Sequence, residues 1–333
     1  MNLNNKNILI TGGTGSFGKS CINFIVKNFN PKKLSILSRD ELKQFELSED
    51  PILKKIKYLR FFLGDIRDKD RLEMAFKNID LVIHAAALKQ VPAAEYNPME
   101  FVKTNIIGAE NIIYASIANN VKKVVCLSTD KAVNPINLYG ATKLASDKLF
   151  IAANNLSGKK TKFSVVRYGN VLGSRGSVIP FFKSFKSKNQ NKIPITDFRM
   201  TRFFISLEDS VKFVLQSINL MDGGEIFIPK IPSVKITDLA KAIVPNCSFN
   251  LIGRRPGEKI SEILLTKDEA INTIENKKCY IVTPQILEDK KLKKYLIKNF
   301  KKVDKEFEYT SALNKELLSQ HQIRNRCKKL GIL

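Results

Sequence analysis

The 333-residue sequence predicts an α/β fold, with a doubly wound parallel sheet and a smaller carboxyl-terminal lobe. Two observations support this prediction. Short apolar runs rich in β-branched residues alternate with longer amphipathic segments over the first 170 residues. A glycine-rich turn joins the first apolar run to the first amphipathic segment. We therefore expect one domain over residues 1–170, and mainly a separate lobe over residues 171–333 that is interleaved with the last strands of the sheet.

The expected strands are apolar runs, and the expected helices lie between them. The strands are Asn7 to Thr11, Lys33 to Ser38, Tyr58 to Leu63, Leu81 to His84, Val124 to Ser128 and Phe163 to Arg167. The helices lie near Phe17 to Lys27, Asp70 to Lys77, Pro98 to Asn119 and Tyr139 to Asn155. After Asn170 the regular alternation ends and glycine and proline become frequent, which indicates the smaller lobe.

Composition excludes several classes of protein. Five scattered cysteines fit neither a disulfide framework nor a zinc site, and the two histidines leave acid–base chemistry to Tyr, Lys, Asp or Glu. We expect no bound metal. No apolar run is long enough to span a membrane and the first residues do not resemble a signal peptide, so we expect a cytoplasmic protein.

The formal net charge of +24 would suit nucleic acid, but the lysines are spread along the chain without a nucleic-acid module, so we expect no nucleic-acid partner. A lysine-rich stretch near the carboxyl end predicts an amphipathic surface helix, with a membrane-facing patch as the alternative. Its lysines are Lys290, Lys291, Lys293, Lys294, Lys298, Lys301 and Lys302.

The glycine-rich turn predicts a dinucleotide site. Gly12, Gly15 and Gly18 lie three residues apart between an apolar strand and a helix. Glycine lets the backbone approach a pyrophosphate, and the helix amino terminus offers free N–H groups. Together these features form the fingerprint of a Rossmann-type fold. The cofactor contacts expected at this turn are Gly12, Thr14, Gly15, Ser16, Phe17 and Gly18.

The end of the second expected strand predicts which dinucleotide binds. Arg39 and Lys43 can flank a 2′-phosphate and Ser38 can donate a hydrogen bond to it, which favours NADP. Asp40 can instead bind a ribose hydroxyl, as in NAD, or cap the next helix. NAD is therefore the alternative cofactor. Beyond the third strand, the expected adenine contacts are Asp65 and Ile66.

Tyr139 and Lys143 stand four residues apart on an expected helix, which places a phenol and an ammonium on one face. A tyrosine with an ordinary pKa of about 10 is a poor base at neutral pH, and a buried cation nearby favours the phenolate. We expect Lys143, together with an oxidised nicotinamide, to lower the pKa of Tyr139.

The glycine turn with Tyr139 and Lys143 resembles the extended short-chain dehydrogenase/reductase family. Just upstream, Asp130 and Lys131 stand in the segment LSTDKAVNP. Epimerases of that family usually carry small or hydroxyl residues at these two positions, and many hexose dehydratases carry Glu at the second. Lysine there resembles the inverting UDP-N-acetylglucosamine 4,6-dehydratases, and the similarity covers nearly the whole chain.

This resemblance implies an activity. The product would be a UDP-2-acetamido-2,6-dideoxy-hexos-4-ulose inverted at carbon 5, which fits a pathway of the pseudaminic acid type. Tyr139 would remove the 4-hydroxyl proton while a hydride passes to NADP and later returns to carbon 6. Lys131 would take the carbon 5 proton, and Asp130 would protonate the departing 6-hydroxyl.

Two conditions follow for Asp130 and Lys131. Successive residues of a strand face opposite ways, so the strand must end near Thr129 if both are to reach one sugar. Burial must also shift the pKa of each group, so that Asp130 is protonated and Lys131 is neutral. An ordinary surface ion pair is the alternative interpretation of the two residues.

Further contacts are expected around this centre. The additional cofactor contacts are Ala85, Lys89, Leu127, Ser128, Tyr139 and Lys143. By resemblance, the substrate contacts are Lys89, Thr129, Asn170, Val178, Ile179, Pro180, Phe181, Phe182, Thr196, Arg255 and Glu308. Arg199 and Arg202 either contact substrate or stabilise the lobe, and His84 ends a strand near the cofactor. The chain departs from the family at Ser261, where histidine is common.

Two other functions are compatible with the sequence. The first is a UDP-N-acetylhexosamine epimerase of the same fold, and the distant one is a basic nucleotide-sensing or nucleic-acid-binding protein. The family resemblance also implies a homo-oligomer that forms through the helices at Pro98 and Tyr139.

Overall fold

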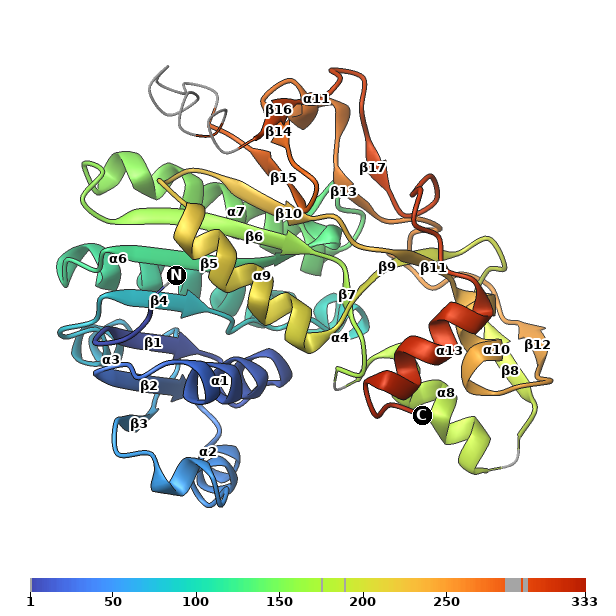
Figure 1. The fold of residues 1–333 in the computed structure, drawn as a ribbon, viewed down its shortest axis with the longest axis horizontal. Coiled ribbons are helices and arrows are strands. Elements are labelled where there is room, and N and C mark those ends of the chain that lie inside the picture. Colours follow the sequence, from blue (N-terminus) through green and yellow to red (C-terminus); the bar gives the residue numbers. More distant parts are fainter. Residues whose placement is uncertain (1, 175, 189, 285–294, 296–298) are drawn as a thin grey trace.

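The computed structural model describes residues 2–174, 176–188, 190–284, 295 and 299–333. Among these residues, ten strands form a central sheet in the order β16-β14-β15-β10-β6-β5-β4-β1-β2-β3 (Figure 1). The strands from β10 to β3 run parallel to their neighbours, whereas β15, β14 and β16 extend the sheet antiparallel. The predicted doubly wound parallel sheet is confirmed.

Six parallel strands lie within one residue of the expected ends. They are β1 (Asn7–Thr11), β2 (Lys33–Ser38), β3 (Leu59–Leu63), β4 (Leu81–His84), β5 (Lys123–Thr129) and β6 (Lys162–Tyr168). A further parallel strand, β10 (Ile226–Pro229), was not expected. The antiparallel strands are β14 (Thr273–Glu275), β15 (Cys279–Val282) and β16 (Lys301–Lys302). Most side chains of the central strands are buried on both faces, as a sheet covered by helices requires.

Helices cover both faces of this sheet (Figure 1). On one face, α1 (Ser16–Asn28) packs beside α9 (Leu207–Leu220). On the other face, α6 (Gly108–Ala118) packs between α3 (Lys69–Ala75) and α7 (Leu138–Leu156).

The single helix expected from Pro98 to Asn119 is divided. It consists of α5 (Pro98–Val102), a π-helical turn (Lys103–Ile107) and α6. Two more helices, α2 (Glu41–Ser48) and α4 (Val91–Tyr96), were not among the expected helical ranges.

A second hydrophobic core lies in a lobe beside the sheet, where Phe182, Ile193, Leu239 and Ile323 are buried together. The elements around it are α8 (Val178–Ser187), β8 (Lys192–Ile195), α10 (Ile236–Ile243), β12 (Ser248–Leu251) and α13 (Gln320–Lys329). The carboxyl terminus lies in this lobe, as Figure 1 shows. Residues after 170 therefore contribute both to the lobe and to the central sheet.

Short elements join the lobe to the sheet. They are β7 (Asn170–Val171), β9 (Thr201–Ile205), β11 (Ser233–Lys235), β13 (Ile263–Leu265), β17 (Tyr309–Thr310) and α11 (Lys267–Ala270). Two 3-10 turns complete the described elements, η1 (Leu53–Lys55) and η3 (Asp130–Ala132).

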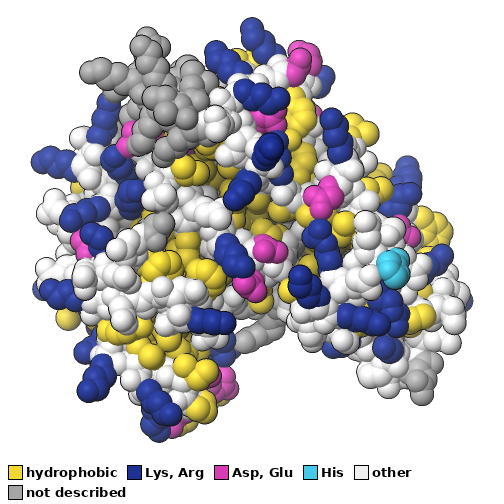
Figure 2. Space-filling view, in the orientation of Figure 1, with side chains coloured by type: hydrophobic (Ala, Val, Ile, Leu, Met, Phe, Trp, Pro, Cys, Tyr) yellow, Lys and Arg dark blue, Asp and Glu magenta, His cyan; other side chains and the backbone are white. Residues whose placement is uncertain are grey.

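The basic side chains are dispersed. Figure 2 shows Lys and Arg scattered over the visible face among hydrophobic and neutral atoms. Of the lysine-rich stretch, Lys290, Lys291, Lys293, Lys294 and Lys298 lie outside the described residues, whereas Lys301 and Lys302 form the edge strand β16 instead of a helix. Within the part of the chain that is described, no helix is both long and apolar enough to cross a bilayer.

Candidate active site

The glycine turn between β1 and α1 is shaped for a ligand. Gly12 has a φ of +66°, and a Cβ at this position would lie 2.8 Å from the backbone of Ala86. Gly15 precedes the first turn of α1 and has no side chain that could cap the amide groups of that turn. A Cβ on Gly18 would overlap the backbone of Gly13. The turn therefore requires glycine, as the fingerprint predicts.

A cavity of about 290 Å³ adjoins this turn. Ten of the expected cofactor contacts line it, namely Gly12, Thr14, Gly15, Ser38, Arg39, Asp40, Lys43, Asp65, Ile66 and Ala85. Leu37, Gly64, Ala86, Ala87, Leu88 and Thr104 line it too and were not expected. Ser16, Phe17 and Gly18 begin α1 beside it. A glycine cradle next to a cavity lined by both basic and acidic side chains fits the pyrophosphate and adenosine of a dinucleotide.

The charged side chains at the end of this cavity next to β2 form ion pairs with one another. The Asp40 carboxylate accepts a hydrogen bond from the Lys43 backbone N–H at 3.0 Å, so it caps α2, and it also pairs with the Lys43 ammonium. Of the two alternatives for Asp40, the structure shows the helix cap. Arg39 lies 3.6 Å from Asp65, and its side chain is about half exposed.

The β5 strand ends at Thr129, and a 3-10 turn then carries Asp130 and Lys131. The strand therefore stops where both side chains need it to stop. Asp130 is fully buried, and its Oδ1 accepts hydrogen bonds from Lys131 Nζ and Thr129 Oγ1, both at 3.0 Å. Among the described residues, nothing hydrogen-bonds to Asp130 Oδ2. A buried, unpaired carboxyl oxygen is unlike a surface ion pair.

Lys131 joins two further groups that come from distant parts of the chain. Its Nζ donates to Asn170 Oδ1 at 3.2 Å and lies 3.4 Å from Glu262 Oε1. Asn170 was an expected substrate contact, whereas Glu262 was missed. Its only signal in the sequence is its position directly after Ser261, where the chain departs from the family pattern.

The pKa of Asp130 shifts in the expected direction, whereas the pKa of Lys131 does not. Burial raises the pKa of Asp130, against the opposing charge of Lys131. Burial also tends to lower the pKa of Lys131, but the negative charges of Asp130 and Glu262 outweigh burial and raise it. The expectation that burial makes Lys131 neutral is therefore wrong for this arrangement, because a second carboxylate stands beside it.

Tyr139 lies in the first turn of α7, which begins with an Asn137 cap that accepts from the Gly140 N–H at 2.8 Å. The phenol is buried and hydrogen-bonds with the Thr129 side chain. Burial raises the pKa of Tyr139 and outweighs the charge of Lys143, which lowers it. Lys143 thus acts in the predicted direction. The net decrease expected from Lys143 together with an oxidised nicotinamide stays a prediction.

Lys143 is buried one turn further along α7. Its Nζ lies 3.9 Å from Cys126 Sγ. Electrostatic interactions with Cys126, and after it with Asp147, outweigh burial and raise the pKa of Lys143, so it remains an ammonium. Ser128 donates to Asp147 at 2.6 Å, so this expected cofactor contact already has an internal partner.

His84 ends β4, as predicted, and its ring hydrogen-bonds with the Thr11 hydroxyl at 2.8 Å. Burial and the charge of Lys143 lower the pKa of His84 to about 3, so it is neutral.

Comparison with known proteins agrees with this geometry. Residues 8–284 match the model of a family described as polysaccharide biosynthesis proteins. The chain belongs to this family. A protein of Campylobacter jejuni strain 81-176 named UDP-N-acetylglucosamine 4,6-dehydratase (inverting) is 60% identical over 284 residues, which are 85% of this chain and 84% of the relative. The predicted membership of the extended short-chain dehydrogenase/reductase family is confirmed.

Other members and neighbours of the family differ in their named activity. A UDP-glucose 4-epimerase of Rickettsia bellii strain OSU 85-389 is 42% identical over 94% of this chain and 92% of its own. The solved structure of Pen from Bacillus thuringiensis is 38% identical and superposes over the whole of both chains with a TM-score of 0.90. A dTDP-glucose 4,6-dehydratase of Streptomyces venezuelae, solved with NAD, shares the fold at 20% identity and a TM-score of 0.67, covering 76% of this chain and 86% of that one.

The expected substrate contacts of this family member are dispersed. Thr129 and Asn170 adjoin Lys131. Within the first turns of α8, Ile179 and Phe182 are buried in the second core, whereas Val178, Pro180 and Phe181 are at least partly exposed. Lys89 and Arg255 are exposed, and Glu308 directly precedes β17. Thr196 donates to Met200 Sδ at 3.1 Å.

The two arginines with alternative predicted roles differ. Arg202 is buried and donates to the backbone oxygens of Thr201, Ile260 and Lys259, which supports a stabilising role. Arg199 is exposed and pairs with Asp197.

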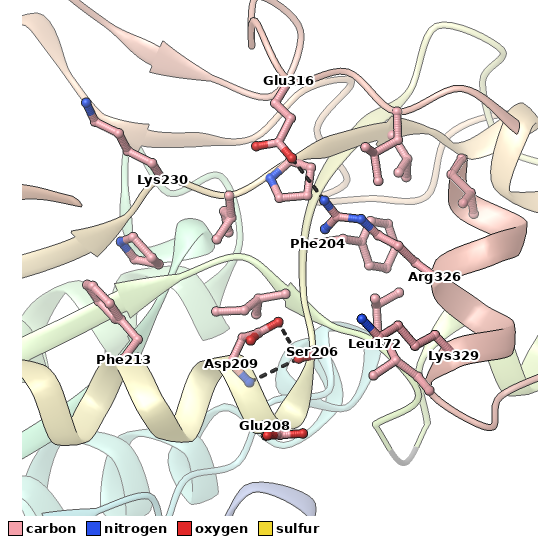
Figure 3. A pocket seen from close by; sticks show the side chains of 18 of the residues that line it. Leu172, Phe204, Ser206, Glu208, Asp209, Phe213, Lys230, Glu316, Arg326 and Lys329 are labelled. Atoms are coloured by element: carbon pink, nitrogen blue, oxygen red, sulfur yellow. Dashed lines mark hydrogen bonds and ion pairs between the residues drawn. The ribbon is translucent and has the colours of Figure 1, made fainter. Parts of the chain in front are cut away.

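A larger cavity, of about 780 Å³, lies between α9, α13 and the strands that join the lobe to the sheet (Figure 3). Arg326 of α13 donates to Glu316 at 3.0 Å on one side, and Ser206 hydrogen-bonds with Asp209 at the start of α9 on another. The described residues that line it include none of the predicted site residues. The predicted cofactor and catalytic residues therefore belong to the smaller cavity and the end of β5.

Proposed function

We propose that this protein is a UDP-N-acetylglucosamine 4,6-dehydratase that inverts carbon 5. One observation carries the proposal: buried Asp130 and half-buried Lys131 follow the end of β5, and Thr129 links the same turn to Tyr139. An elimination needs an acid and a base at one sugar, and a retained ketone intermediate needs a third group at the 4-hydroxyl. The relative that is 60% identical and named for this reaction supports the assignment.

Each predicted catalytic group has a role in this reaction. A nicotinamide cofactor held by the glycine turn and the adjoining cavity would supply the hydride transfer between carbon 4 and carbon 6. Tyr139 takes the 4-hydroxyl proton, with Lys143 holding positive charge one turn away. Lys131 removes the proton from carbon 5, and Asp130 donates the proton with which the 6-hydroxyl leaves as water. Enclosing substrate over Lys131 removes water and strengthens the burial effect that lowers its pKa.

We also propose NADP as the cofactor. Arg39 and Lys43 line the cavity at the end of β2, where a 2′-phosphate would lie, and Asp40 is engaged as the cap of α2. NAD is the alternative. Comparing KM for the two cofactors tests the choice, and a lower KM for NAD would overturn it.

The epimerase alternative is favoured by the relatives named UDP-glucose 4-epimerase, which are about 42% identical. Product mass separates the two activities. Purified protein incubated with UDP-N-acetylglucosamine and trace NADP should yield a product lighter by one water, with a new methyl doublet in the proton NMR spectrum. A product of unchanged mass with altered ring couplings would establish an epimerase instead.

Three further proposals concern the whole chain. A homo-oligomer through α5, α6 and α7 is supported by exposed apolar residues near those helices, namely Tyr96, Met99, Ile107, Tyr114 and Leu156. We propose that residues 1–170 bind the dinucleotide and that the later residues mainly bind the sugar nucleotide. A cytoplasmic location agrees with a nucleotide-sugar substrate.

A further inference from the structure

We propose that Glu262 is a positioning residue that holds the Lys131 ammonium and thereby sets how protons are shared between Lys131 and Asp130. This inference rests on the proposed dehydration. It assigns a task to a buried carboxylate that lies far from the catalytic motif in the sequence.

The position of Glu262 is built into the fold. The residue is 2% exposed, and its Oε1 lies 3.4 Å from Lys131 Nζ and 3.7 Å from Arg202 Nε. Ser311 anchors its backbone on both sides, since Ser311 Oγ accepts from the Glu262 N–H at 2.9 Å and the Ser311 N–H donates to the Glu262 carbonyl at 2.8 Å. Among the described residues, nothing hydrogen-bonds to Glu262 Oε2. A buried carboxylate with a free oxygen is costly unless neighbouring cations use its charge.

Those cations surround it from three elements. Lys131 comes from η3, Arg202 from β9, and Lys259 from the loop before β13. Arg202 cannot readily move away, because three backbone oxygens hold its guanidinium. Lys259 donates to the Val133 carbonyl at 2.6 Å and so ties this loop to the turn after Asp130. The three cations outweigh burial and lower the pKa of Glu262, so it is the ionised carboxylate of the group.

The charge of Glu262 acts on both predicted catalytic groups in the same direction. It raises the pKa of Asp130, which favours the protonated acid. It also raises the pKa of Lys131, which makes the neutral amine a stronger base but keeps Lys131 an ammonium until bound substrate adds to the burial that lowers this pKa. In the elimination, the carbon 5–hydrogen bond breaks as its proton moves to neutral Lys131. The carbon 6–oxygen bond breaks as Asp130 gives its proton to the departing hydroxyl, which leaves as water. The Lys131 ammonium so formed is the charge that Glu262 is placed to stabilise.

Replacing Glu262 by Gln removes the charge with little change in shape. The pKa values of Asp130 and Lys131 should both fall, so both limbs of the pH–rate profile should move to lower pH. We expect the optimum for water loss from UDP-N-acetylglucosamine to move down by about one pH unit. The rate at the wild-type optimum should fall at least about tenfold. Product mass measured across a pH series with the full chain and saturating NADP reports both quantities.

Glu225→Gln is the matched control. Glu225 is 1% exposed and hydrogen-bonded to Ser164 and Tyr295, away from the predicted catalytic turn. Its loss should lower thermal stability but leave the pH optimum unchanged. An equal acid shift in Glu225→Gln would show a general effect of losing a buried carboxylate and would overturn the inference.

Glu262→Asp keeps the negative charge but shortens the side chain by one methylene, which moves the carboxylate away from Lys131. It should lower the rate with a smaller acid shift than Gln gives, and circular dichroism melting shows whether each variant folds. If Glu262→Gln does not fold, the absence of any shift in Glu262→Asp overturns the inference. If Glu262→Gln folds and keeps the pH optimum of the wild type, the inference about Glu262 is overturned as well. The proposed function still stands in that case, provided that the wild-type enzyme dehydrates UDP-N-acetylglucosamine. A wild-type enzyme that forms no dehydrated product would remove the proposed function itself.

Discussion

The backbone carbonyl of Lys131 packs against Gly140 so closely that a Cβ on Gly140 would overlap it. Gly140 follows Tyr139 in the first turn of α7, and its lack of a side chain lets η3 lie directly on that helix. The turn with Asp130 and Lys131 and the helix with Tyr139 therefore hold one another in place.

Gly140→Ala should push these two elements apart. We expect kcat for water loss to fall about 10-fold to 100-fold, because small displacements of reacting groups are costly, and the free energy of unfolding to fall by about 1–3 kcal/mol. Steady-state kinetics and urea unfolding measure the two effects. Ala141→Ser, at the exposed neighbouring position, should change neither. Wild-type kcat in Gly140→Ala would contradict the role of this contact.

Lys131→Ala should abolish water loss by removing the base at carbon 5. We expect a decrease of about 10²-fold to 10⁴-fold, the usual contribution of a general base. Product mass after incubation with UDP-N-acetylglucosamine measures it. Lys148→Ala, on the exposed side of α7, is the control and should retain activity. Full dehydration by Lys131→Ala would remove Lys131 from the mechanism.

Tyr139 should make the first hydride transfer depend on pH. Burial raises the pKa of Tyr139, so the phenolate is scarce at neutral pH and the rate should increase as pH rises. Lys143→Met removes a charge that lowers this pKa and should therefore move the rising limb to still higher pH. Absorbance of reduced nicotinamide in a single turnover reports this step. Lys148→Met should leave the limb in place, and an acid shift in Lys143→Met would contradict this assignment.

Arg39→Ser should weaken the binding of NADP more than the binding of NAD. Loss of a charged hydrogen bond to the 2′-phosphate should raise KM for NADP by about tenfold or more. KM for NAD, which lacks that phosphate, should change little. Lys54→Ser, beyond the end of α2 and paired with Glu49, is the control for general loss of positive charge. An equal increase in KM for both cofactors would show that Arg39 does not bind the 2′-phosphate.

Arg167 should contribute to the free energy of unfolding and take no part in the dehydration reaction. It is 2% exposed, donates to Glu269 at 3.0 Å and lies 3.8 Å from Asp147, so it ties β6 to α7 and α11. Arg167→Met leaves two carboxylates without their cation and should lower the free energy of unfolding by about 3–5 kcal/mol. Urea unfolding measures the change. Arg199→Met, which removes an exposed pair, should have a far smaller effect, and equal effects would contradict this role of Arg167.

Patterns within short stretches of the sequence predicted those features of the structure that depend on residues close together in the chain. The parallel strands, the glycine turn and the segment from Asp130 to Lys143 follow from spacing within one strand or one helix. The end of β5 at Thr129 was likewise required by the opposite directions of successive strand residues. The division of the helix after Pro98 could not be predicted in this way, because its π-helical turn packs against α7.

The charges around Lys131 were decided only by the tertiary structure. The folding of the later chain onto the end of the sheet brings Glu262 to Lys131 and Arg202 to Glu262. No periodic pattern in the sequence links such distant positions. The predicted acid and base therefore follow from the sequence, but the predicted direction of the Lys131 pKa shift is wrong. A pKa depends on every charge within a few ångströms, and those charges come together only when the chain folds.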